Sequence, residues 1–314
     1  MQAQRARLPN GRWHFQHGPI DLVIGADGAA GAVAAAHEAA WRRFETVLPE
    51  LVAELRALRL PVRCESGPSR DRVGPCPLQG AIALRMWLAC RPYHAQFITP
   101  MAAVAGAVAQ ELIGRYEQAG VERAWVNNGG DIALHLAPGA SVKVGLFADL
   151  ARFDPADGEL RIDADFEVSA ALPVRGIATS GWRGRSFSLG IADSVTVLAR
   201  SAAMADAAAT VIANAVDVDD PRIVRRPANQ LKDDTDLGGI AVTVDVPPLD
   251  AAQVLAALHS GARRARELQR AGLIHAAVLV CQHRAVGVGV EAEAEARSAS
   301  VAGTASAELG SVFA

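Results

Sequence analysis

The hydrophobic and polar positions of this chain switch repeatedly between a two-residue period and a helical period. Short runs rich in valine and isoleucine predict strands, and apolar positions three and four residues apart predict helices. Helices are expected at 29–59, 101–119, 202–216 and 249–271, and residues 81–88 fit either state. Strands are expected at 12–24 on both sides of a turn, then at 123–127, 132–136, 141–147, 153–174, 194–199, 240–246 and 276–290. Strands cluster without strict alternation with helices, which indicates an α+β fold of mixed or antiparallel sheets with packed helices.

Residues 12–290 are expected to form a single domain. Residues 1–11 form an N-terminal extension, and residues 291–314 are small, polar and aperiodic, which predicts a disordered tail. The helix at 101–119 has good boundary signals, with Thr99 as N-cap, Pro100 at the first helical position and Gly120 as its stop.

The alanine-rich helix at 202–216 carries three polar residues, Asp206, Thr210 and Asn214, spaced four apart. Residues at i and i+4 share a helix face, so the three form one polar stripe. Such a stripe either packs against other polar groups or binds a ligand. The expected loop at Thr179, Ser180 and Gly181 supplies hydroxyls and flexible backbone suited to an anionic or ribose-bearing ligand.

A second feature is the segment Asn127-Asn128-Gly129-Gly130-Asp131-Ile132 between two predicted strands. The glycines permit positive φ and a close approach of backbone to a ligand. Taken alone, the segment favours a β-hairpin turn.

Together these features resemble the ApbE-like superfamily, best known for FAD:protein FMN transferases. The order N-N-G-G-D-I, A-T-S-G and A-D-A-A-A-T carries the resemblance, and it is greatest to the UPF0280 branch. Supporting motifs lie at 17–22 (HGPIDL), 98–106 (ITPMAAVAG), 186–190 (SFSLG) and 236–238 (DLG). The resemblance spans residues 12–289, nearly the whole chain.

The resemblance implies a flavin, FAD or FMN, or another phosphate-bearing cofactor, with Mg²⁺ at Asp206 and Thr210. Carboxylate and hydroxyl oxygens are hard ligands of the kind that Mg²⁺ prefers. The alternative, given equal weight, is that Asp206 accepts hydrogen bonds from backbone amides of the Thr179 loop. Arginines beside that loop suit phosphate or carboxylate. The expected cofactor-binding residues are Asn128, Gly129, Gly130, Asp131, Thr179, Ser180, Gly181, Arg183 and Arg185, and Arg175 flanks the same loop.

The chain departs from the flavin transferases at two motifs. Their H-x-x-D-P-x-T-G segment is replaced by residues 186–193, which contain no histidine, and a lysine of theirs is replaced by Gln110. The sequence therefore leaves open whether the chain is an enzyme with transferase activity or a catalytically silent binding or assembly partner in a cofactor biosynthesis pathway. His17 and Ser180 are weak catalytic candidates, and a serine hydrolase lacks support because no G-x-S-x-G elbow occurs.

Composition narrows the partners. A net charge of −3 gives no electrostatic case for nucleic acid. Without an apolar run of membrane-spanning length or a secretory signal, a cytoplasmic location is expected. The four cysteines have no C-x-x-C spacing, so a zinc site is not expected, and the loop between Cys64 and Cys76 has no assigned role. The expected partner is a small phosphate-bearing molecule, and a homodimer is compatible with the sequence.

Overall fold

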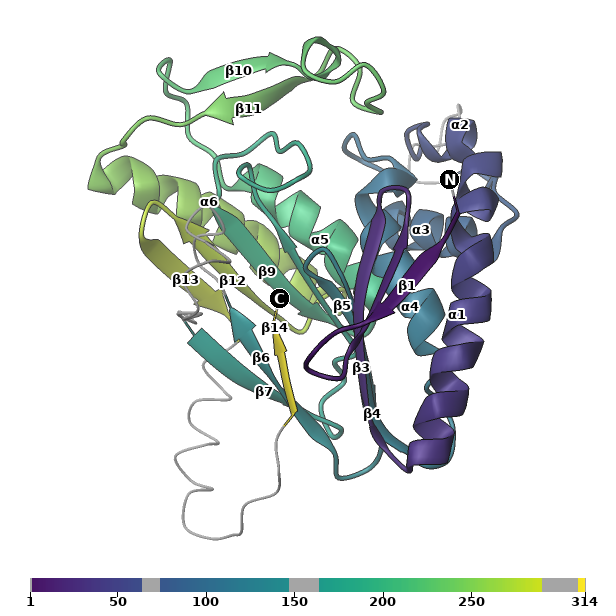
Figure 1. The fold of residues 1–314 in the computed structure, drawn as a ribbon. Coiled ribbons are helices and arrows are strands. Elements are labelled where there is room, and N and C mark those ends of the chain that lie inside the picture. The colour runs from purple at the N-terminus through teal and green to yellow at the C-terminus, as the bar shows by residue number, and fades with distance from the viewer. Residues whose placement is uncertain (1, 64–73, 147–163, 290–309, 314) are drawn as a thin grey trace, which may run out of the picture. The chain divides into compact units, whose positions relative to one another are not determined.

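The computed structural model, drawn as a ribbon in Figure 1, describes residues 2–63, 74–146, 164–289 and 310–313. By their contacts these residues divide into two compact units. The first unit comprises Met1–Ser141, Ser169–Ala178 and Arg200–Ala207, and the second comprises Val142–Val168, Thr179–Ala199 and Ala208–Ala314. Each unit is described by itself below, and the single domain expected at 12–290 stays a prediction.

The first unit contains a meander of antiparallel strands, as the alternating pattern predicts. Their order is β1 (Gln4–Arg7), β2 (Trp13–His17), β3 (Ile20–Gly28), β4 (Val121–Asn128), β5 (Asp131–Leu136) and β8 (Gly176–Ser180), whose last two residues belong to the second unit. The turn between β2 and β3 is short because Gly18 adopts a positive φ of 58°.

Helix α1 (Ala30–Ala53) packs on β2 and β3 through an apolar stripe at helical spacing (Figure 1). Phe15 of β2 is fully buried, and its ring centroid lies 5.1 Å from that of Trp41 and 5.5 Å from that of Phe44. The remaining helices of this unit are α2 (Leu55–Leu58), α3 (Ala81–Cys90), η1 (Arg91–Tyr93), η2 (Pro100–Ala103) and α4 (Val104–Ile113). Residues 81–88, which fit either state from sequence, are therefore helical.

The helix predicted at 101–119 is shorter than expected. Pro100–Ala103 form a 3₁₀ turn with a hydrogen bond from the Ala102 amide to the Thr99 carbonyl, and Thr99 makes no side-chain capping hydrogen bond. The α-helix itself ends at Ile113, before the chain turns to bury Tyr116 completely. The Tyr116 hydroxyl then lies 2.7 Å from His37 Nδ1. The helix thus ends six residues before its expected last residue, Ala119, where the chain turns and buries Tyr116.

One carboxylate ties α4 to the neighbouring helices of the first unit. Glu111 of α4 is largely buried and accepts hydrogen bonds from Arg43 of α1 at 2.7 Å and Arg85 of α3 at 2.8 Å. Charge-assisted bonds to a largely buried acceptor are stronger than exposed ion pairs. They hold α4, whose first residues contact the candidate site.

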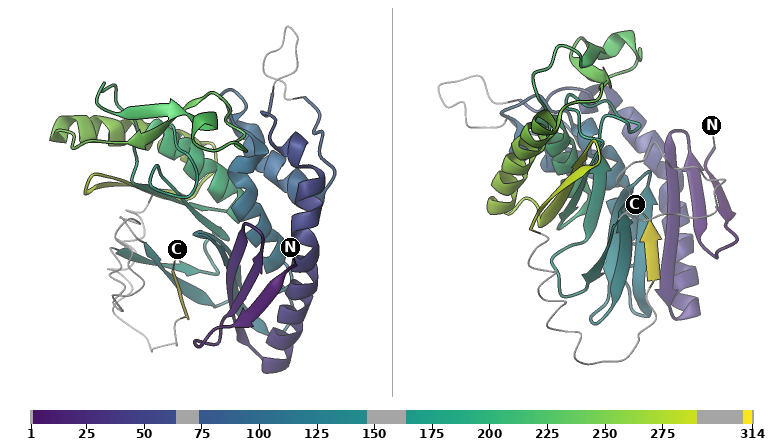
Figure 2. Two further views of the ribbon diagram at one scale, coloured as in Figure 1. Left: turned by 45° about the horizontal axis from the view of Figure 1, so that its top comes forward. Right: turned by 90° about the vertical axis from the view of Figure 1, so that its left-hand side faces the viewer.

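The second unit contains the antiparallel strands β9 (Ser194–Ala199), β12 (Ala276–Cys281) and β13 (Arg284–Val288), in the order β8-β9-β12-β13. Helix α6 (Ala251–Arg270) lies along β12 and β13 (Figure 2) and begins with a capping box of Asp250 and Gln253. Strands β10 (Val224–Pro227) and β11 (Ala241–Asp245) form a separate antiparallel pair. The short helix η4 (Ala228–Gln230) and the loop after it connect the two strands.

A third sheet in this unit has the order β14 (Gly310–Phe313), β6 (Ser141–Leu146) and β7 (Ala164–Ser169). Strand β14 pairs with β6 in parallel. Within the tail predicted at 291–314, residues 310–313 thus form a strand, and 291–309 and 314 lie outside the described residues, as do residues 147–163.

Helix α5 (Ala202–Ala215) is the predicted alanine-rich helix, with its first six residues in the first unit and the rest in the second. Antiparallel strands with packed helices confirm the predicted α+β class. No helix in the described ranges is both long and apolar enough to cross a membrane.

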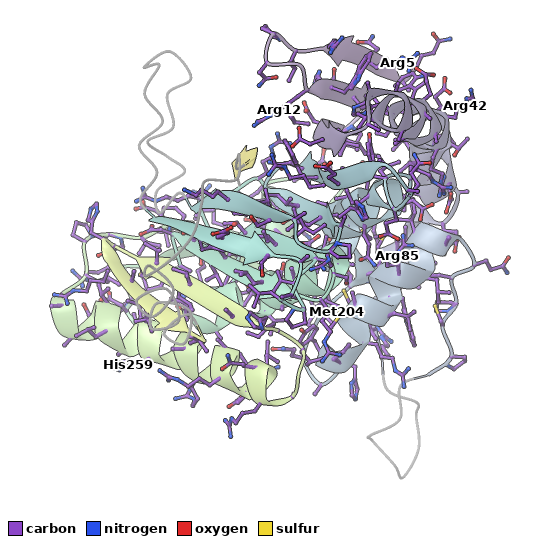
Figure 3. The ribbon with its side chains drawn as sticks, turned by 90° about the horizontal axis from the view of Figure 1, so that it is seen from below. Arg5, Arg12, Arg42, Arg85, Met204 and His259 are labelled. Atoms are coloured by element: carbon purple, nitrogen blue, oxygen red, sulfur yellow. The ribbon has the colours of Figure 1, made fainter. Side chains whose placement is uncertain are left out.

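The pair formed by His37 and Tyr116 predicts a pH dependence of stability. Burial, together with the charge of Arg7, lowers the pKa of His37 from 6.5 to about 4. His37 therefore binds a proton more readily in the unfolded chain than in the folded one. As a result, the free energy of unfolding is highest above pH 6.5 and falls as the pH drops towards 4. Urea unfolding of His37→Gln at several pH values should show a smaller loss over this window than the wild type. The same change at exposed His259 (Figure 3) should leave the wild-type profile; an unchanged profile in His37→Gln would contradict the assignment.

Candidate functional site

The polar stripe of α5 is the side of the helix that keeps contact with solvent. Asp206, Thr210 and Asn214 are each partly exposed. Most of the other residues of the helix are buried: Ala202, Ala203, Ala205, Ala207, Ala208, Ala209, Val211, Ile212 and Ala213. The residues spaced four apart in the sequence are therefore among the partly exposed residues of the helix, together with Met204 and Ala215.

Asp206 at one end of the stripe accepts hydrogen bonds from the start of α4. Its Oδ2 lies 2.9 Å from the amide nitrogen of Gly106, and the amide of Ala105 also donates to the carboxylate. Burial of the carboxylate raises the pKa of Asp206 to about 7 in spite of these two donors. The alternative prediction, a carboxylate that accepts hydrogen bonds from backbone amides, is therefore correct in the kind of donor. It is wrong in the donors it named, because the amides belong to Ala105 and Gly106 and not to the Thr179 loop.

Two glycines allow the first residues of α5 to pack this closely. A Cβ at Gly106 would lie 2.3 Å from the carbonyl oxygen of Ala202, and a Cβ at Gly176 would lie 2.0 Å from the carbonyl carbon of Ser201. Both distances are far below van der Waals contact, so no other residue fits without movement of the backbone. Gln110, where the transferases carry a lysine, accepts a hydrogen bond from the Ala203 amide at 3.3 Å and so caps α5.

The segment Asn127–Asp131 forms the predicted hairpin turn between β4 and β5. Gly129 and Gly130 have φ values of 66° and 112°, which explains the glycine pair. Asn127 Oδ1 accepts from the Gly130 amide at 2.8 Å, and Asn128 Nδ2 donates to the carbonyl of Ala105 at 3.1 Å. The turn thus contacts the same residues that hold Asp206; its ligand role stays a prediction.

The segment Thr179–Gly181, predicted to be a loop, lies partly in strand β8. Thr179 and Ser180 are the last residues of the strand, and the Thr179 hydroxyl lies 2.9 Å from that of Thr196. The Ser180 hydroxyl makes no hydrogen bond within the described ranges and is half-buried. Gly181 packs against the backbone of Asp193, because a Cβ there would lie 2.3 Å from the Asp193 carbonyl oxygen.

The three arginines expected around this segment have different surroundings. Arg175 donates to the carbonyls of Ala170, Leu172 and Val174, which is a structural role within its own turn. Arg183 Nε lies 3.4 Å from Asp193 Oδ1. Arg185 is exposed. Only Arg183 and Arg185 therefore stay candidates for an anionic ligand.

Asn214, at the other end of the stripe, holds the loop that contains Ser188. Its Oδ1 accepts from the Leu189 amide at 2.9 Å and from the Ser188 hydroxyl at 3.2 Å. Both outer members of the stripe therefore hold protein backbone. The Thr210 hydroxyl between them has no hydrogen-bond partner in the part of the chain that the structure describes.

The surroundings of His17 and of the cysteines give little support to a catalytic or metal-binding role. His17 is buried, with its ring edge-on to Phe44 at 6.2 Å between centroids. Cys90 and Cys281 are buried and Cys76 is partly exposed, all as free thiols, while Cys64 lies outside the described residues. Within the described ranges, no three His, Cys, Asp or Glu side chains gather in a way that could hold a metal ion.

The predicted site residues divide between the two units. Asp206 and the hairpin residues Asn128, Gly129, Gly130 and Asp131 belong to the first unit, and Thr179, Ser180, Gly181, Arg183, Arg185 and Thr210 belong to the second. Sequence reasoning noted Gln110 only as a departure from the family motif and did not find that its side chain caps α5.

A family model described as "AbpE bacteria" matches residues 5–295, so the chain belongs to that family. It is 40% identical over 159 residues to a UPF0280 protein of Methanopyrus kandleri, covering 50% of this chain and 59% of that one. It is 37% identical over 130 residues to a UPF0280 protein of Methanospirillum hungatei, covering 41% and 50%. The chain thus spans a half or slightly more of the length of these relatives. The resemblance drawn from the motifs is confirmed.

Two solved structures show a more distant likeness in fold. The apo form of the flavinyl transferase ApbE of Pseudomonas stutzeri has a TM-score of 0.41 and 14% identity, covering 94% of this chain and 95% of that one. An ApbE protein of Thermotoga maritima has a TM-score of 0.43 and 11% identity, covering 94% and 99%.

The close packing at the start of α5 predicts a sharp difference between two glycines. Gly176→Ala should lower the free energy of unfolding by about 2 kcal/mol or more, because its Cβ must displace the backbone at Ser201. Gly31→Ala, at an open helical position of α1, should raise it by about 0.5–1 kcal/mol. Urea unfolding of both variants measures the two changes, and equal effects would refute the packing constraint.

Proposed function

We propose that this protein binds a flavin nucleotide, FAD or FMN, or another phosphate-bearing cofactor, together with Mg²⁺ held by Asp206 and Thr210. The observation that carries the proposal is the accessible polar face of α5. Thr210 presents a hydroxyl with no hydrogen-bond partner in the described ranges, one helical turn from the carboxylate of Asp206. A polar face kept on a buried helix suits a ligand.

The residues fit a magnesium ion of the kind that proteins share with a substrate. Such an ion uses one or two carboxylates, keeps several waters and takes further oxygens from phosphates, so a cluster of three acidic residues is not required. The amides of Ala105 and Gly106 orient the Asp206 carboxylate, and burial leaves its negative charge poorly solvated. When bound, Mg²⁺ would supply a compensating positive charge to this carboxylate and to the phosphates of the ligand.

Residues of the second unit supply further groups for an anionic ligand. Ser180 has a half-buried hydroxyl without a partner in the described ranges, and the Arg183 side chain is 36% exposed. A guanidinium group matches phosphate oxygens in both geometry and charge. We assign Ser180 and Arg183 to the phosphate or ribose portion of the ligand. The hairpin Asn128–Asp131 of the first unit stays a separate candidate for cofactor binding.

Transferase activity is the enzymatic form of this proposal. The resemblance to FAD:protein FMN transferases favours it, whereas the absent H-x-x-D-P-x-T-G segment favours a second candidate, a catalytically silent binding or assembly partner in a cofactor pathway. The use of Gln110 as a helix cap supports the second candidate, because this position then serves structure. Chromatography of FAD incubated with the protein, Mg²⁺ and candidate acceptor proteins separates the two: cleavage of FAD supports transfer, and intact bound FAD supports the silent form.

Substitution of Asp206 tests the metal assignment. Thermal unfolding of the wild type with FAD, FMN or ADP should show a rise in Tm that requires Mg²⁺, corresponding to about 2.7 kcal/mol at a hundredfold excess over Kd. Asp206→Asn keeps the size and a carbonyl acceptor for the Gly106 amide but removes the charge, so the Mg²⁺-dependent part of the rise should disappear. Asp233→Asn, at an exposed position, should keep it.

A metal-free measurement separates loss of binding from loss of folding. The folded-state pKa of Asp206 is raised, so the charged form opposes folding, and this penalty grows as the pH rises from about 4 through 7. Above pH 7 without metal, Asp206→Asn should therefore unfold at or above the wild-type temperature. Retention of the full Mg²⁺-dependent rise in this folded variant would show that Asp206 is not a ligand.

A further inference from the structure

Helix α3 of the first unit presents an apolar face to solvent. The helix has the sequence AIALRMWLAC, and its exposed positions are Ala81, Leu84 and Leu88, the two leucine residues being 37% and 49% exposed. The only charged side chain of the helix, Arg85 (Figure 3), donates to Glu111 of α4 at 2.8 Å. A surface helix normally turns charged and polar residues to solvent, so this face is typical of an interaction surface.

The exposed positions have the spacing of a contact between two helices. Arg91 directly follows α3 and continues its helical backbone, with φ −51° and ψ −40°. Ala81, Leu84, Leu88 and Arg91 are thus three, four and three residues apart on exposed positions of one continuous helical segment. This alternation gives one narrow stripe that packs against the equivalent stripe of a second helix. The stripe therefore fits a helix as its partner.

The two ends of the stripe carry opposite charges. At the start of α3, the Glu54 carboxylate accepts hydrogen bonds from the amides of Gln79 at 2.8 Å and Gly80 at 2.6 Å. At the other end, the exposed Arg91 guanidinium lies 5.9 Å from the centroid of the Trp87 ring and forms no ion pair within the described ranges. A complementary helix therefore brings a positive charge to the start of α3 and a negative charge to its end.

We propose that the α3 face binds α3 of a second copy of this chain, in an antiparallel pair about a two-fold axis level with Met86. The stripe is symmetric about this position, so Leu84 of one copy contacts Leu88 of the other. In the same arrangement Arg91 approaches Glu54 at the start of the other helix. A two-fold axis repeats every pairing, so each copy covers the leucine residues of the other and supplies an opposite charge to its arginine. The inference is independent of cofactor binding.

The size of the contact sets the expected strength. A helix of 10 residues is about 15 Å long, so two such helices form an interface at the small end of the range for specific complexes. We expect a reversible dimer with a Kd on the order of 10–100 µM. Sedimentation velocity of the wild-type protein, over a concentration series on both sides of this range, should show a shift from monomer to dimer.

A matched pair of leucine variants locates the interface. Leu84→Glu should leave the protein monomeric across the series, because the new carboxylate would have to lie against Leu88 of the other copy without a partner. Leu255→Glu changes a leucine on helix α6 that is 37% exposed, as Leu84 is, and should dimerise like the wild type. Circular dichroism of both variants checks that they are folded.

A charge reversal tests the antiparallel orientation. Arg91→Glu should weaken the dimer about fivefold or more, because it places a second carboxylate beside Glu54 of the other copy. In a parallel pair Arg91 would instead lie beside Arg91, and the reversal would replace one like-charge contact with another. Arg266→Glu, at an exposed position of α6, is the control and should leave the Kd unchanged.

Three results would overturn the proposal. One is a wild type that stays monomeric at every concentration, which would leave the face to a different partner. Another is a dimer that persists in folded Leu84→Glu, and the third is a dimer that Arg91→Glu does not weaken. The concentration series of the wild type gives a decision even if a variant does not fold.

Discussion

The structure around the candidate site depends on the close approach of the start of α5 to two glycines. Gly106 and Gly176 leave room for the backbone of Ser201 and Ala202, and this contact brings Asp206 within 2.9 Å of the Gly106 amide. The same approach lets Gln110 cap α5. Asn128 separately ties the β4–β5 hairpin to the carbonyl of Ala105. A side chain at either glycine would separate α5 from the residues that orient its carboxylate.

The polar stripe of α5 combines structural hydrogen bonds with the binding role that we propose for it. Its outer members, Asp206 and Asn214, accept hydrogen bonds from backbone amides that lie far away in sequence, which satisfies donors that would otherwise be buried and unpaired. Its middle member, Thr210, keeps a hydroxyl without such a partner in the described ranges. A helix built for packing alone would carry an alanine there. The raised pKa of Asp206 adds to this, because a carboxylate whose charge is poorly solvated gains from a bound cation.

In the second unit, packing and hydrogen bonds fix the loop after β8 and the turn between β12 and β13. Gly181 against Asp193 fixes the loop, and Asp193 in turn binds the Gln282 amide of a turn in which Gln282 and His283 have φ values of 42° and 64°. Such values are unfavourable for residues other than glycine, so the surrounding contacts must maintain them. The amide-to-carboxylate hydrogen bond supplies part of that energy and couples the turn to the loop of Trp182 and Arg183.

Much of the fold was legible from the sequence because strands and helices leave a local period. The hairpin at Asn127–Asp131, strand β9, helix α5 and helix α6 lie where the pattern predicts them, and the motif order was enough to indicate the family. The end of α4 at Ile113 was not predictable, because the burial of Tyr116 ends the helix before its glycine stop. Likewise, Thr179 and Ser180 belong to a strand because β8 pairs with β9. The local sequence, which is rich in glycine and hydroxyl residues, does not indicate this pairing.

The sequence by itself determined which chemical groups the site can offer: a carboxylate, several hydroxyls and three arginines near glycine-rich turns. Only the tertiary structure decided how each is used. It directs Arg175 to the carbonyls of its own turn, leaves Thr210 and Ser180 without a partner in the described ranges, and buries the indole N–H of Trp182. The physical reason is that a hydrogen-bond partner is chosen by position in space. Asp206 and Gly106 are 100 residues apart in the chain, and no local pattern records a contact over that separation.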